Sequence, residues 1–274
     1  MRMARLKTVA GLLLVLFMQL VFLFGSSPFI LLGMDAIQAT MLWDVLACLA
    51  VAAWFRRKRP AGWRGRPVRH GPLTDPRRLG PWMAVLAAYS MAASACMSMS
   101  MLFLESIIED PGMAARTDVV ESSGVLWYLL LSVFVAPFAE ELFYRIYTYG
   151  ALRRLLGAWP AAALSAILFG AGHTTLGHLV TGTMFGFLLC MVYEYTGSWW
   201  ASVFCHFVYN FSVIAVSMSD GLVSASTTTL GGVLSTVASI VLVLGSCAPV
   251  VRKETCYGLY GVPGVPDRDE ANHP

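Results

Sequence analysis

The sequence predicts an all-α protein, a polytopic bundle of transmembrane helices. Of its 274 residues, 57% are hydrophobic and only 13% are charged, about half of the charge that a soluble domain carries. The mean hydropathy is +0.67. A large core does not account for this deficit, because the surface of a soluble protein would still need its charged residues. Lipid is therefore the expected solvent for most of this surface.

Eight apolar stretches are candidates to cross the hydrocarbon core of a bilayer, which takes roughly 20 helical residues. In chain order they are 9–24 (extending toward 32), 37–55, 82–104, 126–149, 159–174, 179–195, 199–218 and 230–251. Basic residues precede the first stretch, but no small-residue cleavage site follows it. We therefore expect a retained anchor and a bundle of about eight spans.

The charge of the loops predicts how these helices are oriented. The stretch 56–78 holds nine Lys or Arg against Asp75, whereas the loop after the third span is acidic. Because basic loops stay in the cytoplasm, we expect 56–78 and, after eight crossings, both termini to be cytoplasmic. The net charge is only +3 and no basic face is evident beyond this loop, so nucleic acid is not an expected partner.

This pattern divides the chain into four parts. Residues 1–125 hold the N-terminal spans and the basic loop 56–78, and residues 126–217 hold the spans with the most unusual polar residues. Residues 218–253 form the last span. The stretch 254–274 is rich in Gly, Pro and charge and is expected to be a disordered cytoplasmic tail.

The fourth span carries charges where lipid is expected: Glu140, Glu141 and Arg145. Each charge at mid-membrane costs roughly 2.5–3.5 kcal/mol on an insertion scale, more in total than the upstream apolar residues return. The segment therefore needs an internal partner, a water-filled cavity or a position near the interface. A helix that simply ends at Glu140 is disfavoured, because the apolar pattern continues to Arg153. Glu141 precedes Arg145 by four residues, so we expect a supporting ion pair between them.

Two further spans carry polar groups at helical spacing. Phe169 and His173 lie four residues apart in the fifth span, and His206 and Asn210 lie four apart in the seventh. Residues four apart share one face of a helix. Each pair alone is weak evidence for a site, because a His in a membrane helix is often a hydrogen-bonded packing residue.

Depth in the membrane decides whether these groups can meet. Glu140 lies 17 residues before Gly157 and His173 lies 16 residues after it. At 1.5 Å per residue both are roughly 25 Å from that turn, so an antiparallel hairpin brings them level. The same count places His206 shallower by about 10 Å, which requires tilted helices or a hairpin that projects into the cytoplasm.

Taken together, the three motifs resemble a family signature. Glu140-Glu141-x-x-x-Arg145, Phe169-x-x-x-His173 and His206-x-x-x-Asn210 follow the order found in the CAAX-processing and bacteriocin-processing (CPBP, or Abi) intramembrane endopeptidases. The resemblance covers about 126–217, a third of the chain, which it marks as a CPBP-like catalytic core. It implies hydrolysis of a peptide bond within or beside the membrane. It also implies that Glu140 and His173 activate water, while His206 and Asn210 stabilise the oxyanion.

The chemistry of the residues agrees with these roles. Amide hydrolysis needs a base, a water molecule and donors aimed at the developing oxyanion. An Asn amide and an imidazole N–H both donate, and the spacing of His206 and Asn210 aims them the same way. Glu140 and Glu141 are about 100° apart on a helix, so we do not expect them to share one role.

Zinc is the alternative to a metal-free reaction. Glu140, His173 and His206 form a possible His₂Glu ligand set with water as the fourth ligand. The two His residues of a zinc site need orienting carboxylates, and none is identifiable within these spans. We therefore expect no metal or other cofactor. The implied partners are the lipid bilayer and a membrane-embedded or lipidated substrate of the prenylated CAAX, leader-peptide or hydrophobic-tail class.

Two functions outside proteolysis are also open. A proton-coupled transporter could use Glu140, Glu141 and the His residues as a relay, although the half-to-half symmetry typical of transporters is not seen. A non-catalytic immunity or scaffold protein could retain all three motifs.

Two smaller patterns concern packing. Gly182 and Gly186 form a GxxxG pattern that favours close helix packing inside one bundle over a dimer face. The Met-rich run 97–101 favours a lipid-facing filler, with a substrate-facing surface as the alternative.

Reporter fusions test the predicted topology. Fusions within 56–78 and within the tail 254–274 should both report the cytoplasm, because the excess of Lys and Arg holds that side inside. A fusion at Gly112 should report the external side, with protein abundance measured in parallel. A cytoplasmic signal at Gly112 contradicts the eight-span arrangement.

Overall fold

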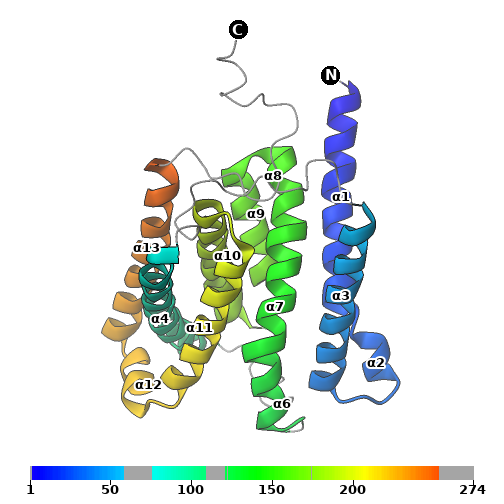
Figure 1. The fold of residues 1–274 in the computed structure, drawn as a ribbon. Helices are drawn as coiled ribbons and strands as arrows, with labels where there is room; N and C mark the ends of the chain where they lie inside the picture. Colours follow the sequence, from blue (N-terminus) through cyan, green and yellow to red (C-terminus); the bar gives the residue numbers. More distant parts are fainter. Residues whose placement is uncertain (1, 59–75, 109–120, 122, 174, 253–274) are drawn as a thin grey trace.

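The structure is a computed structural model that describes residues 2–58, 76–108, 121, 123–173 and 175–252. Every regular element in these residues is a helix, and the helices form one bundle (Figure 1). The predicted all-α membrane fold is confirmed. Residues 59–75 of the basic loop, the acidic stretch 109–120 and the tail 254–274 lie outside the described residues.

Within the described residues, seven helical segments are long and apolar enough to span a membrane. Six of these segments correspond, one each, to the following helices: α1 (Arg2–Phe24) together with the short α2 (Ser27–Leu31), α3 (Ala36–Lys58), α4 (Pro76–Ile107), α10 (Leu176–Thr196), α11 (Trp199–Ser217) and α13 (Thr229–Arg252). The seventh is a composite segment, Val125–Arg153. The shorter apolar helix α9 (Ala158–Gly170) follows it, and α12 (Asp220–Ser226) joins α11 to α13.

The composite segment contains π-helical turns on both sides of the charged motif. It runs through α6 (Val125–Leu129), η1 (Leu130–Val135), α7 (Ala136–Glu141), η2 (Leu142–Tyr149) and α8 (Gly150–Leu156). Pro137 explains the first interruption, because it has no N–H to donate and its ring crowds the preceding turn. Such π-turns are often found at functional sites.

The fifth predicted span is shorter than expected. It was predicted to reach residue 174, but α9 ends at Gly170, so its 13 residues extend only about 20 Å. Glycines at 170 and 172 weaken the helix, and the chain continues in tight turns with His173 N–H bonded to Gly170 O at 3.1 Å. His173 therefore lies beyond the helix end and not inside the span.

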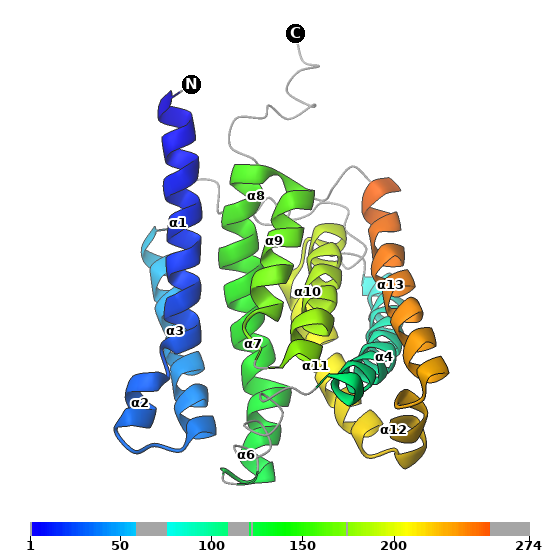
Figure 2. The ribbon, with the colours of Figure 1, turned by 180° about the vertical axis from the view of Figure 1, so that it is seen from behind.

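The centre of the bundle is α10, which packs against α9, α4, α11 and α13 (Figures 1 and 2). The α1–α3 pair lies to one side, where α3 contacts α7 and α1 contacts α8. Asp35 caps the start of α3 and accepts a hydrogen bond from Ser123, just before α6, which holds the pKa of the Asp35 carboxyl below its usual range. Helices α3 and α6 thus begin side by side and run in the same direction.

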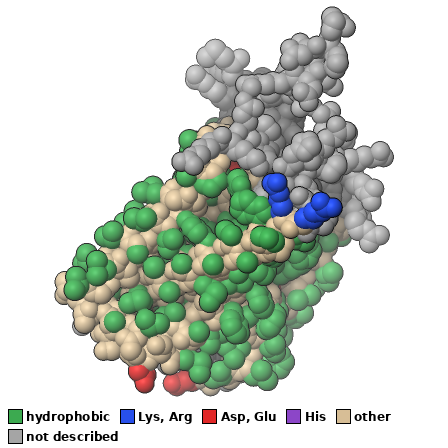
Figure 3. Space-filling model, turned by 60° about the vertical axis from the view of Figure 1, so that its left-hand side comes forward, with side chains coloured by type: hydrophobic (Ala, Val, Ile, Leu, Met, Phe, Trp, Pro, Cys, Tyr) green, Lys and Arg blue, Asp and Glu red, His purple; other side chains and the backbone are tan. Residues whose placement is uncertain are grey.

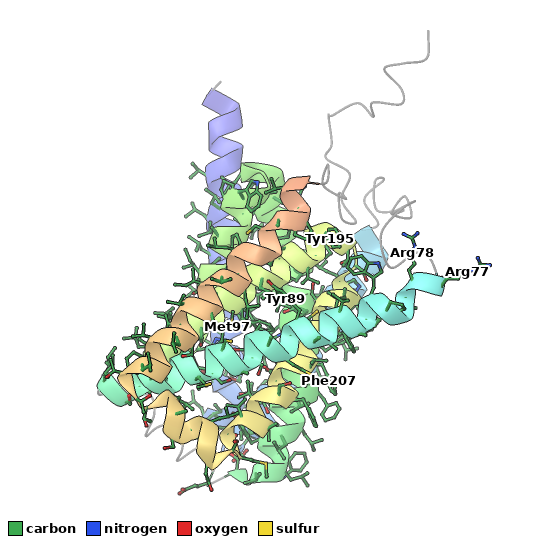
Figure 4. The ribbon with its side chains drawn as sticks, turned by 90° about the vertical axis from the view of Figure 1, so that its left-hand side faces the viewer. Arg77, Arg78, Tyr89, Met97, Tyr195 and Phe207 are labelled. Atoms are coloured by element: carbon green, nitrogen blue, oxygen red, sulfur yellow. The ribbon has the colours of Figure 1, made fainter. Side chains whose placement is uncertain are left out.

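Helix α4 crosses the bundle obliquely, with Arg77 and Arg78 at one end and Met97 in the middle (Figure 4). It packs against α10, α11, α12 and α13. Met97 is fully buried and Met101 is only 8% exposed, so the expectation of a lipid-facing methionine run is wrong for these two residues. The reason is that one face of α4 packs against α10, α11, α12 and α13.

The surface agrees with a membrane environment. Hydrophobic side chains cover most of the face in Figure 3, with Lys and Arg near one end and acidic side chains at the other. The start of α1 and the end of α13 lie at the same end of the bundle, as an even number of crossings requires (Figure 1).

A buried ionic cluster ties the composite segment to α10. Glu194 accepts hydrogen bonds from Tyr149 and from Arg153, whose Nη2 lies 3.1 Å from Glu194 Oε2. Glu194 and Tyr149 are almost fully buried. A buried carboxylate needs such partners, because an unpaired charge in this environment is costly.

Candidate active site

A cavity of about 330 Å³ brings the predicted catalytic residues together. Glu140, His173, His206 and Asn210 all line it, although they come from α7, from the turn after α9 and from α11. The depth mismatch estimated for His206 does not separate the groups, because the helices are tilted and the π-turns advance less per residue than an α-helix does.

Glu141 and Arg145 form a fully buried ion pair. Arg145 Nε lies 2.8 Å from Glu141 Oε2, and its Nη2 donates to Oε1 at 3.2 Å. Both side chains are 0% exposed. The guanidinium also lies 5.4 Å from the Phe169 ring centre and 3.5 Å from the Cys190 sulfur, so it contacts α9 and α10. This pair joins three helices around one charge centre.

His206 bridges the two glutamates, a contact that the sequence analysis did not anticipate. Its Nδ1 lies 3.0 Å from Glu141 Oε1, and its Nε2 lies 3.6 Å from Glu140 Oε2. Glu141 is held ionised by Arg145 and can only accept, so Nδ1 carries a hydrogen and donates. His206 Nε2 then faces Glu140.

Aromatic rings fix the orientation of both histidines. Phe169 and Phe185 meet the His206 ring edge-on, with centroid distances of 5.7 Å and 5.2 Å. Phe169 also lies 5.3 Å from the His173 ring. His173 Nδ1 is 3.1 Å from the Phe169 carbonyl oxygen. The first residue of the second motif thus positions the histidines of the second and third.

Close packing of α9 on α10 makes this arrangement possible. A Cβ on Gly182 would come within 3.3 Å of Gly170 Cα, and one on Gly186 would meet Phe169 at 3.0 Å. The GxxxG pattern therefore packs helices inside one bundle, as predicted. Its position next to Phe169 and His173 also makes it a support of the site.

Asn210 has a structural bond in addition to its position in the cavity. Its Nδ2 donates to Ser132 O at 2.7 Å. In the π register of η1, Leu131 O accepts from the Ala136 amide, and Ser132 O would next accept from Pro137, which has no N–H. Asn210 supplies the missing donor. One of its two N–H groups is therefore used to stabilise the interrupted helix.

Asp44 is a buried carboxyl group near the site that the sequence analysis missed. It is 5% exposed. Cys48, one turn later on α3, packs against Leu142 and Ile146. Asp44 lies one helical turn before Cys48. Because α3 and α7 run in the same direction, Asp44 is level with the turn of α7 that carries Glu140. The two carboxyl groups are close enough for their charges to interact. A lone Asp in an apolar span was the available signal.

The arrangement of Glu140, His173 and His206 bears on the zinc alternative. In the part of the chain that the structure describes, no group of three His, Cys, Asp or Glu side chains has the spacing of a metal site. His206 directs its two nitrogens at two carboxylates, and His173 Nδ1 faces a backbone carbonyl. However, the expectation that no carboxylate orients these histidines is wrong, because Glu141 holds His206.

Comparison with known proteins bears on the same segment. Residues 122–212 match the family model described as Type II CAAX prenyl endopeptidase Rce1-like. The matched segment is similar to the family that the three motifs resemble. The match contains all three motifs and ends two residues after Asn210.

Relatives support the family but cover only part of the chain. The chain is similar to the Bacillus subtilis (strain 168) protein named "Putative membrane peptidase YdiL", at 28% identity over 110 residues. That alignment covers 40% of this chain and 44% of the relative, so it spans less than half of either protein. No solved structure matches the chain. The apolar helices and the family together show an integral, multi-pass membrane protein.

The buried ion pair generates a stability prediction. Arg145→Ala should lower the abundance and the thermal midpoint of the detergent-purified protein, because removing one partner of a buried pair costs about 3–5 kcal/mol. Glu141→Gln should do the same and also release His206. The double variant Glu141→Gln/Arg145→Met should recover abundance, because no uncompensated charge is left. Glu121→Gln, at an exposed position, is the matched control. Normal abundance and normal activity in both single variants contradict this role.

Proposed function

We propose that the protein is an intramembrane endopeptidase that hydrolyses a peptide bond of a membrane-associated substrate with water activated by Glu140. The observation that carries this proposal is the contact of Glu140 with His206 inside a cavity that His173 and Asn210 also line. The family match of residues 122–212 supports the same reaction class.

Glu140 is the group suited to act as base. Its side chain is 23% exposed although it lies within a helical bundle, and it lines the cavity. Glu141 is engaged by Arg145 and His206 and has no exposure, so it orients and does not react. His173, on the turn after α9, lines the same cavity and is the second group proposed to hold the attacking water.

The contact of Glu140 with His206 Nε2 links base and oxyanion donor. His206 donates through Nε2 only when it is the imidazolium, because Nδ1–H is bonded to Glu141. Glu140 is then the carboxylate, which is the form that accepts a proton from water. A proton on His206 Nε2 therefore gives His206 a donor for the oxyanion and leaves Glu140 as the base. The Asn210 amide, which has two N–H groups, is the second proposed oxyanion donor.

The cavity also restricts the class of substrate. Besides its polar groups it is lined by Met101, Leu131, Val213 and Ile214. An apolar wall beside buried acid and base groups suits a hydrophobic peptide that enters from the bilayer. Prenylated CAAX-type proteins, leader peptides and hydrophobic tails all have this character.

Comparison of protein termini tests the activity. Cells that carry the wild type should contain new termini that are absent from cells carrying Glu140→Gln. His173→Ala and His206→Ala should also abolish these termini while the proteins still insert and purify. Asn210→Ala should keep a residue of activity, because losing one oxyanion donor costs about 10²–10³ in rate. Identical termini in wild type and Glu140→Gln refute the proposal and favour a non-catalytic role.

We further propose that the reaction needs no metal, because the described carboxylates and imidazoles are directed at one another and not at a shared point. Elemental analysis of active, detergent-purified protein should find zinc far below one equivalent. Near-stoichiometric zinc, with activity lost on removal and restored on return, overturns this assignment. Inhibition by a chelator alone does not count as evidence of zinc.

A further inference from the structure

A third histidine, outside the three motifs, lines the same cavity. His178 lies in the first turn of α10, one turn before Gly182. Its ring stacks on that of His173, with a centroid distance of 5.7 Å and an interplanar angle of 4°. The side chain is 23% exposed, although the helix that carries it is the most buried of the bundle. The two imidazoles therefore stand side by side in the cavity wall.

Thr175 and Glu105 hold His178 from behind. Thr175 Oγ1 donates to Glu105 Oε1 at 3.0 Å and lies 2.8 Å from His178 Nδ1. The hydroxyl has one hydrogen, which goes to the carboxylate, so its oxygen accepts from His178 Nδ1–H. Glu105 Oε1 also lies 3.8 Å from Nδ1. This tautomer makes Nε2 the nitrogen that gains and loses a proton.

The cluster shows the features of a built site. Glu105 and Thr175 are 5% and 2% exposed. The same Thr175 oxygen caps α10 by accepting the His178 backbone N–H at 3.1 Å. A Cβ on Gly177 would come within 3.0 Å of the Glu105 carboxylate, so the glycine leaves the space that this carboxylate occupies. Glu105 comes from α4, outside the matched segment 122–212.

We propose that His178 is a further catalytic residue, the general acid that protonates the leaving amine, and that Glu105 and Thr175 are its positioning residues. This inference rests on the proposed function. An amide nitrogen leaves readily only when it receives a proton as the C–N bond breaks. Glu140 and His206 are already assigned to the attacking water and to the oxyanion, so a separate donor completes the set.

The step balances with water as the only co-reactant. The water oxygen forms a bond to the carbonyl carbon, and one water proton passes to Glu140. The C–N bond then breaks, its electron pair stays on nitrogen, and the nitrogen takes the proton from His178 Nε2. The products are a carboxylic acid and an amine. Transfer of the proton held by Glu140 back to His178, through water in the cavity, restores both groups.

A pair of substrates separates this chemical role from a structural one. The probes are a quenched fluorogenic peptide with the sequence cleaved in the terminus comparison and a depsipeptide in which the scissile N–H is replaced by oxygen. An ester leaving group needs no protonation, so an acid that acts on the amine is required only for the peptide. His178→Gln should slow cleavage of the peptide by roughly 10²–10⁴-fold and leave ester cleavage nearly unchanged.

Variants of the supporting residues make the test independent of His178 itself. Thr175→Val and Glu105→Gln should show the same selective loss on the peptide. Thr175→Ser, which keeps the hydroxyl, should recover most of the peptide cleavage that Thr175→Val loses. Thr227→Val, in the exposed turn before α13, is the matched control for loss of a threonine hydroxyl. Thermal unfolding in detergent checks that each variant is folded.

Each outcome decides between the hypotheses. Equal losses on peptide and ester assign His178 to structure, and unchanged cleavage of both removes any role; either result overturns the inference. The proposed function is tested separately by Glu140→Gln, which should cleave neither probe. Cleavage of the peptide by Glu140→Gln at the wild-type rate refutes the proposed function itself.

Discussion

The centre of the candidate site depends on one buried carboxylate, that of Glu141, which joins Arg145 to His206. It lies inside a membrane bundle with no exposure, where an unpaired charge would be intolerable. Arg145 compensates it from the same helix and extends to the Phe169 ring and to Cys190 on α10. Glu141 Oε1, which accepts from Arg145 Nη2, also holds His206. The Glu141 carboxylate raises the free-energy cost of inserting this segment into a membrane, and the same carboxylate orients His206.

Interruption of the helix that carries Glu141 is the second constraint. Pro137 leaves Ser132 O without a helical donor, and the side chain of Asn210 on α11 provides one. This bond couples the composite segment to the helix that presents His206. The positions of His206 and Asn210 and the repair of the π-turn therefore cannot vary independently.

Sequence patterns with a local origin predicted the fold and the motif residues well. Hydrophobic stretches indicate spans because each helix must meet lipid by itself, and the four-residue spacing of Glu141 and Arg145 is a property of one helix. The end of α9 was predicted wrongly, since composition did not show that Gly170 and Gly172 would stop an apolar helix. That error placed His173 inside a span, although it lies on a turn.

Contacts between distant helices could not be predicted in the same way. The approach of His206 to both glutamates depends on helix tilt and on the π-turns, and neither leaves a periodic signal. Asp44 and Glu194 stand as single charges in apolar stretches, which indicates a partner without naming it. Likewise, the burial of Met97 follows from the packing of one face of α4 against four other helices, which hydropathy does not show.

Two histidines of the cavity share one arrangement although they come from different helices. Nδ1 of His206 is bonded to Glu141, and Nδ1 of His178 is bonded to the Thr175 hydroxyl, which Glu105 holds in place. The partner of His206 lies in the matched segment 122–212, whereas Glu105 belongs to α4, which precedes it. Asp44 comes from α3 and also precedes that segment. The matched segment therefore contains Glu140, His206 and Asn210, while the preceding helices contribute Glu105 and Asp44. It follows that two chains with the same three motifs can differ in rate and in pH dependence through helices that carry no motif.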